Sequence, residues 1–139
     1  MQLEEQARVN LWDIHEAARE IAGFVRGVQF EEFEKNKVLR YAVERQLHVI
    51  GEVAAHIAPQ FCQKHPEIEW IKLSELRRFL AHQYGDTVIK RVWLAATEGL
   101  PEMLVPLEKF IRGNANIQEL VFRHESTTIA KHRITYKWV

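Results

Sequence analysis

Apolar residues spaced three or four positions apart run along most of this 139-residue chain, which is the spacing of one buried face on an α-helix. In the clearest case, residues 3–25, the repeating positions are Leu11, Ile14, Ala18, Ile21, Ala22 and Val25. Gly23 and Gly27 mark the end of that predicted helix. Because such a helix must bury its apolar face against other helices, the pattern predicts an all-α helical bundle.

Further helices are predicted downstream of the first one. A second stretch with apolar residues at helical spacing runs from residue 31 to residue 62. Within it, Pro59 predicts a kink or an early end of the helix near Ala58. After a break that begins at His65, three shorter helices are expected at 71–81, 87–98 and 101–111, with Asp86 as a candidate N-cap. The segment Gly99-Leu100-Pro101 is expected to interrupt the chain before the last helix. Residues 1–112 should therefore form one domain of four to five helices.

The C-terminal residues 113–139 form a tail that lacks a helical period. Ile134 to Val139 alternate in the manner of a strand, yet an all-helical body offers no partner strand. A disordered end, a docking segment and a short hairpin all remain open for this tail.

The composition excludes several classes of protein. Hydrophobic residues make up 47% of the chain and charged residues 27%, which is enough apolar surface for a packed core. No stretch approaches the ~18–20 apolar residues that a membrane span needs, and the acidic start is unlike a signal peptide. The single cysteine, Cys62, has no partner for an internal disulfide. We therefore expect a cytoplasmic protein without a membrane partner.

Charge is unevenly distributed, although the formal net charge is zero. Residues 71–91 carry 5 Lys/Arg against 2 Asp/Glu, and residues 112–139 carry the same numbers, whereas residues 1–70 carry 8 against 12. A phosphate-bearing ligand would prefer the two basic segments. The seven histidines show no pair at metal-ligand spacing, so we expect neither a metal nor a cofactor. His48, His56 and His65 are expected at the surface or at the boundary of the core.

Arg77, His82 and Tyr84 lie close together in the first basic segment. Histidine can serve as acid or base near neutral pH, and arginine grips phosphate oxygens through a planar fork. Tyrosine can donate a hydrogen bond to phosphate or stack on a base. These residue types suffice for cleaving an RNA backbone without a metal. On spacing alone, the trio also fits an ordinary helix C-terminus, where cationic residues and a Tyr-Gly stop are common.

Helical geometry constrains how this trio can act. On an unbroken α-helix, Arg77 and His82 would lie roughly 140° apart, whereas Arg78 and His82 would share a face. Either the helix ends near Ala81 and brings His82 round to Arg77, or Arg78 shares the role of phosphate ligand. We expect Arg78 to contact phosphate and to disfavour the protonated form of His82.

The residues around the trio resemble a known family. The trio itself fits the HEPN pattern of Arg, four to six residues, His, any residue, Tyr, with four residues between Arg77 and His82. Upstream, residues 47–53 (LHVIGEV) resemble the "L-x-x-I-G-E-A" signature of HepT-like proteins. The resemblance covers roughly residues 8–112. Further matches to the family are residues 68–70 (IEW, against "I-P-W"), Trp93, and Leu100-Pro101.

The resemblance implies a helical HEPN domain that forms a homodimer, with two copies of the motif meeting in a cleft at the interface. It implies a toxin that cleaves RNA, in some members tRNA, without a metal ion. Arg77 would stabilise the phosphate, His82 would transfer protons and Tyr84 would orient the substrate. The implied partner is a minimal nucleotidyltransferase (MNT) antitoxin, which can attach AMP to the motif tyrosine, here Tyr84. Because one chain supplies one motif histidine, a dimer could place acid and base on different chains.

Two points in the site and two other functions remain open. Many family members carry Asn or another small polar residue at the position of Arg78, so either Arg77 or Arg78 could be the main phosphate ligand. Glu52 is either a carboxylate that holds a motif arginine or an exposed helix charge. The chain could instead be a non-catalytic HEPN module that binds nucleotide or partners a nucleotidyltransferase. A purely structural adapter would leave the trio exposed and scattered.

Overall fold

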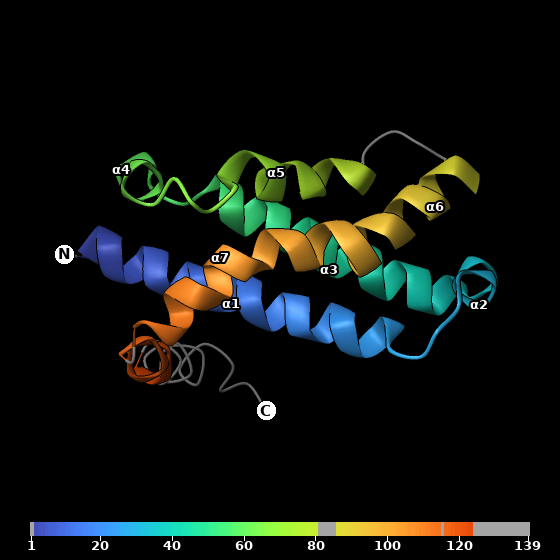
Figure 1. Cartoon of the computed structure of the whole chain (residues 1–139), viewed down its shortest axis with the longest axis horizontal. Helices are drawn as coiled ribbons and strands as arrows, with labels where there is room; N and C mark the ends of the chain where they lie inside the picture. The colour runs from blue at the N-terminus through green and yellow to red at the C-terminus, as the bar shows by residue number, and fades with distance from the viewer. Residues whose placement is uncertain (1, 81–85, 115, 124–139) are drawn as a thin grey trace, which may run out of the picture.

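The computed structural model describes residues 2–80, 86–114 and 116–123, and within these ranges every regular element is helical (Figure 1). The all-α bundle predicted from the apolar period is therefore confirmed. Its two long helices, α1 (Gln2–Val25) and α3 (Lys37–Ala55), pack against each other. A second side of α3 is covered by α5 (Trp70–Glu75) and by the 3₁₀ helix η1 (Leu76–Leu80). None of the described helices is both long and apolar enough to cross a membrane.

The core lies between α1, α3 and the later helices, and its side chains are those of the predicted apolar period. Five of its fully buried side chains are Leu11, Ile14 and Ile21 of α1 and Leu47 and Ile50 of α3. Burying a side chain of this size contributes about 1.5–3 kcal/mol to folding relative to leaving it exposed. Among the described residues, no polar or charged residue is fully buried, so hydrophobic burial is the main force that holds α1 and α3 together.

The structure divides the predicted helix of residues 31–62 into three helices, so the prediction is wrong at Asn36, whereas the early end predicted near Ala58 is confirmed. These are α2 (Phe30–Lys35), α3 and α4 (Pro59–Lys64). The first break falls at Asn36, whose backbone is extended and whose side chain accepts a hydrogen bond of 3.0 Å from the backbone N–H of Leu39. This is an N-cap, which begins a new helix more favourably than an unbroken helix would accommodate asparagine. Pro59 occupies the first position of α4, where its missing N–H costs little.

The interruption predicted at Gly99-Leu100-Pro101 is also wrong. Helix α6 (Asp86–Leu94) continues through a π-helical turn, η2 (Ala95–Gly99), into α7 (Leu100–Arg112). The backbone N–H of Leu100 donates to the carbonyl of Ala95, five residues back, which is the π-helical pattern. Pro101 then falls in the first turn of α7, where no intrahelical donor is needed. The chain thus remains helical through Gly99 and Pro101, from α6 to α7.

Part of the predicted tail is helical. Residues 117–123 form a helix, and Ile117 and Val121 are buried in a small cluster with Val9 of α1. Trp12, also from α1, packs against this cluster. The absence of helical structure predicted from residue 113 onward is therefore wrong for residues 117–123. The strand-like pattern of residues 134–139 lies outside the described residues.

Candidate active site

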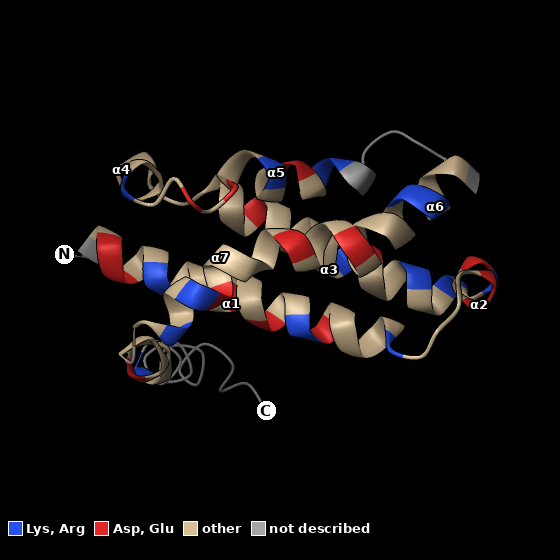
Figure 2. Ribbon diagram, in the orientation of Figure 1, with Lys and Arg blue, Asp and Glu red and all other residues tan. Residues whose placement is uncertain are grey.

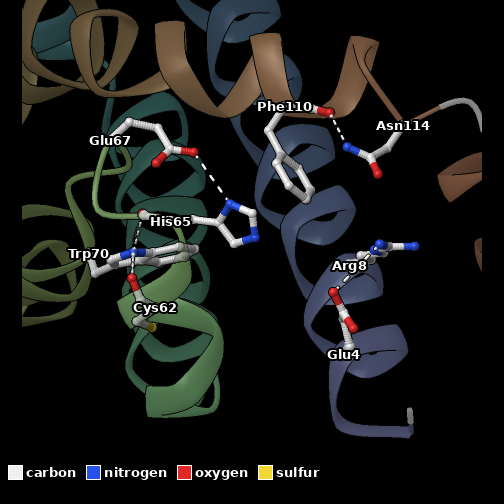
Figure 3. Close-up of polar contacts among 8 residues, drawn as sticks. All are labelled: Glu4, Arg8, Cys62, His65, Glu67, Trp70, Phe110 and Asn114. Atoms are coloured by element: carbon white, nitrogen blue, oxygen red, sulfur yellow. Dashed lines mark hydrogen bonds and ion pairs between the residues drawn. The ribbon is translucent and has the colours of Figure 1, made fainter.

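The segment that carries Arg77 is anchored at its start by Trp70. The indole N–H of Trp70 donates to the carbonyl oxygens of Cys62, at 3.2 Å, and His65, at 2.9 Å (Figure 3). Both acceptors belong to α4 and its end, so these bonds tie α5 to the preceding helix. Figure 3 also shows His65 directed toward Phe110 of α7 while its imidazole pairs with Glu67. The start of α5 is therefore held by neighbours on several elements.

The helix after Trp70 changes type before it reaches Arg77. Helix α5 ends at Glu75, and residues 76–80 continue as the 3₁₀ helix η1. The helix predicted for 71–81 is therefore α-helical only as far as Glu75, and the unbroken α-helix on which the angle of roughly 140° depends is not present over residues 76–80. Leu73 and Leu76 remain buried, which fixes η1 against the core. His82 and Tyr84 lie outside the described residues, so their positions relative to Arg77 stay predictions.

The backbone of Arg77 packs directly on α3 at Gly51. A Cβ atom added to Gly51 would lie 2.3 Å from the amide nitrogen and 2.7 Å from the Cβ of Arg77. Real Cβ atoms do not approach other atoms this closely, so only glycine permits η1 to sit at this distance from α3. Gly51 is the glycine of the HepT-like signature at residues 47–53. Its lack of a side chain allows the backbone of Arg77 to pack against α3.

The side chain of Arg77 faces Glu52, the residue after Gly51. The guanidinium Nη1 lies 3.7 Å from the Glu52 carboxylate Oε1, and the two side chains are 37% and 42% exposed. Glu52 thus contacts a motif arginine, the first of the two roles considered for it. Because both groups are substantially solvated, their attraction is weak, on the order of 1 kcal/mol or less. Arg77 therefore remains available to an anion, and Arg78 beside it is exposed as well.

His48 is a further contact that the sequence interpretation missed. Its ring Nδ1 lies 3.4 Å from the backbone carbonyl oxygen of Arg77, which is a long hydrogen bond. The ring is half-buried, so its expected place at a boundary is correct, but its contact with Arg77 was not anticipated. Residues three and four apart on a helix share a face, and His48, Gly51 and Glu52 have that spacing. This spacing was the available signal that all three lie toward Arg77.

Charged side chains surround this end of the bundle. Lys and Arg occur on both segments that flank residues 81–85, with Arg77 and Arg78 on η1 and Lys90 and Arg91 on α6 (Figure 2). Glu44 lies on α3 one turn before His48, and burial raises the pKa of its carboxyl while the nearby Arg40 partly opposes that shift.

Within the described residues, no three His, Cys, Asp or Glu side chains are grouped so as to hold a metal ion.

The all-α bundle and the Arg-x4-His-x-Tyr motif are together the features expected of a HEPN-type domain. Residues 14–110 match the family model described as "Ribonuclease HepT-like". The chain therefore belongs to the HepT-like ribonuclease family, as its sequence resemblance indicated.

Several relatives support this assignment. A protein of Thermococcus cleftensis named "Probable ribonuclease HepT" is 35% identical over 71% of this chain and 90% of its own length. Two proteins of Methanocaldococcus jannaschii, both named as predicted RNases, are 37% and 34% identical. They cover 73% and 70% of this chain, and the matches span 84% and 90% of their own lengths. The search of solved structures gave no match.

Proposed function

We propose that this chain is a metal-independent endoribonuclease and the toxin of a HEPN/MNT toxin–antitoxin pair. The observation that carries the proposal is the position of Arg77. Its backbone packs directly on Gly51, and its guanidinium stays exposed beside Glu52. An accessible guanidinium on a fixed stretch of backbone is suited to binding a phosphate diester. Membership in a ribonuclease family and the names of the relatives support RNA as the source of that phosphate.

The proposed reaction is transesterification within the RNA backbone. A base removes the proton of a 2′-hydroxyl, the O2′–P bond forms, the P–O5′ bond breaks, and an acid protonates the leaving O5′. Arg77, with Arg78 beside it, would stabilise the negative charge that gathers on the phosphate oxygens. His82 would transfer protons and Tyr84 would orient the substrate. A homodimer would bring two copies of these residues into one cleft, and tRNA is a candidate substrate.

The proposed control of this activity is AMP attached to Tyr84 by a partner nucleotidyltransferase. The added group would place a phosphate and a bulky nucleoside in the cleft of the proposed dimer. Its negative charge would occupy the arginine and repel RNA phosphate, while the nucleoside would block access to the site. The modified protein should therefore be inactive, and a gain in intact mass on co-expression with the nucleotidyltransferase should accompany the loss of cleavage.

The decisive experiment measures RNA cleavage by the unmodified protein in the presence of EDTA. Wild-type protein should cleave RNA and leave 2′,3′-cyclic phosphate ends, and its expression should arrest growth. His82→Ala should abolish both effects, whereas the matched change His56→Ala, at the exposed residue that follows α3, should abolish neither. A non-catalytic nucleotide-binding or adapter module would be indifferent to His82→Ala. Absence of cleavage by unmodified wild-type protein would rule out the enzyme.

A further inference from the structure

His48 contacts the motif arginine through one ring nitrogen and leaves the other available. Its Nδ1 faces the carbonyl oxygen of Arg77 at 3.4 Å. A carbonyl oxygen only accepts hydrogen bonds, so the contact requires that Nδ1 carry the proton. In the neutral imidazole, Nε2 then bears the lone pair and is the basic nitrogen. Within the described ranges, no hydrogen bond occupies Nε2.

The position of His48 relative to the phosphate ligand makes this basic nitrogen relevant to chemistry. His48 is one helical turn before Glu52, and the carboxylate of Glu52 lies 3.7 Å from the guanidinium of Arg77. One side of α3 therefore brings an imidazole, a carboxylate and the arginine to the same patch. Glu44 and Glu52 lie four residues before and after His48 on α3, so helical spacing places their charges on the same face as the ring, and Arg77 lies next to that face on η1. The ring is half-buried, so it is held in place and still reached by solvent.

Protonation of His48 requires no rearrangement. When Nε2 takes up a proton, Nδ1 keeps its own proton and continues to donate to the carbonyl of Arg77. The ring of His48 can thus gain and lose a proton while its contact with η1 is kept. A group that must alternate between two protonation states during catalysis benefits from such an anchor, because no geometric change accompanies proton transfer.

We propose that His48 is the general base of the reaction, supplied by the same chain as Arg77; this rests on the ribonuclease function proposed above. Nε2 of His48 takes the proton of the attacking 2′-hydroxyl as the O2′–P bond forms. The P–O5′ bond breaks, and the leaving O5′ takes its proton from His82, the acid that the motif supplies. His48 afterwards releases its proton to solvent. A second histidine from a partner chain is then not needed as the base.

The test separates proton transfer from simple support of η1. In His48→Asn, the amide nitrogen replaces Nδ1 as donor to the Arg77 carbonyl, but the titratable Nε2 is lost. Single-turnover cleavage of a defined RNA should fall about 100-fold or more, since general acid–base groups contribute on this scale. The rise in rate with pH that a histidine base produces should also disappear, while RNA affinity stays near the wild-type value. His15→Asn, on α1, should change neither quantity.

Each result bears on the proposal in a defined way. Wild-type rates in His48→Asn, or a slow variant with an unchanged pH profile, would overturn the general base and leave the ribonuclease function intact. No cleavage by wild-type protein would instead remove the proposed function itself. An independent measurement on wild-type protein covers the case in which His48→Asn fails to fold. Nitrogen NMR of the neutral ring should show the proton on Nδ1, and a proton on Nε2 would contradict the proposal.

Discussion

Gly51 of α3 and Arg77 of η1 approach so closely that a single methyl group between them would lie 2.3 Å from the amide nitrogen of Arg77. The contact is between backbones, so no rotation of a flexible side chain can relieve it. It places the motif arginine at a fixed depth against the core, where Glu52 reaches its guanidinium and His48 reaches its carbonyl. Substitutions on this side of α3 should therefore affect activity and stability in distinguishable ways.

Gly51→Ala should destabilise the protein and reduce RNA cleavage. Overpacking costs about 1–3 kcal/mol. A contact of 2.3 Å with backbone atoms belongs in the upper part of that range, above the roughly 1 kcal/mol that alanine gains over glycine in a helix. Urea unfolding measures the loss, and the reduced cleavage follows because η1 must move away from α3. Gly23→Ala is the matched control, since nothing lies within 4 Å of a Cβ at that position of α1. The control should gain stability, and an equal gain in Gly51→Ala would contradict the close contact.

Glu52→Gln should strengthen RNA binding without a large change in stability. The carboxylate competes with phosphate for Arg77, but both side chains are about two-fifths exposed, so the pair contributes on the order of 1 kcal/mol or less. Its removal should tighten binding by about fivefold at most. Fluorescence anisotropy with labelled RNA measures this, with Glu69→Gln as the control, because Glu69 pairs with the exposed Lys72 instead. Weaker binding by Glu52→Gln would mean that Glu52 positions Arg77 more than it competes.

Trp70→Phe should destabilise the bundle, because phenylalanine keeps the aromatic ring but loses the N–H. Two acceptors, the carbonyls of Cys62 and His65, would lose their partner. At about 0.5–1.5 kcal/mol for each hydrogen bond, the loss should be about 1–3 kcal/mol. Denaturant titration followed by circular dichroism measures it. An unchanged midpoint would indicate that the connection between α4 and α5 does not depend on the indole.

The sequence predicted those helices whose bounds are set by their own residues, and it did not predict those whose bounds depend on packing against other helices. Helix α1 was predicted to within one residue at its start, because its apolar period is unbroken from Leu3 to Val25. The break before α3 was missed, because the apolar period continues across Asn36 and a side-chain cap outweighs it there. The break after α3 was predicted, because a proline at position 59 cannot continue the preceding helix. The change from α5 to η1 has no clear signal in the sequence, since it depends on how Leu76 is buried against α3.

The candidate site was predicted only in part, because some of its contacts depend on packing between distant segments. Arg77 was singled out because its spacing to His82 and Tyr84 is a property of the sequence alone. The contact between His48 and Arg77 joins residues 29 positions apart, so it depends on the packing of η1 on α3. Only the spacing of His48, Gly51 and Glu52 pointed to a shared face. The roles of His82 and Tyr84 stay predictions, because both residues lie outside the described ranges.

Arg78→Asn tests whether the second arginine binds phosphate. Arg78 is exposed, so the substitution should change stability by no more than about 0.5 kcal/mol. If Arg78 neutralises one phosphate of single-stranded RNA, the slope of log K against log salt should fall in magnitude by about 0.7. RNA titrations at several salt concentrations measure this slope. An unchanged slope, together with an unchanged rate and pH profile of cleavage, would leave Arg77 as the phosphate ligand without help from Arg78.

Glu44→Gln should stabilise the protein at neutral pH. Burial raises the pKa of the Glu44 carboxyl above its ordinary value, and Arg40 opposes this only partly. The folded state therefore favours the protonated acid, so the stability contributed by this group is fully present below the ordinary carboxyl pKa. That stability is lost as pH rises through the raised pKa. Glutamine is neutral at every pH and should remove this loss.

Urea unfolding of wild type and Glu44→Gln, at neutral pH and at about pH 4, measures the difference in their free energies of unfolding. The gain should be present at neutral pH and should shrink in acid, where the wild-type carboxyl is itself protonated. Glu75→Gln, an exposed position at the end of α5, should show no comparable gain. If Glu44→Gln is instead less stable at neutral pH, the attraction between Glu44 and Arg40 outweighs the cost of burial. The carboxylate would then be held ionised one turn from His48, as a fixed negative charge beside the proposed base.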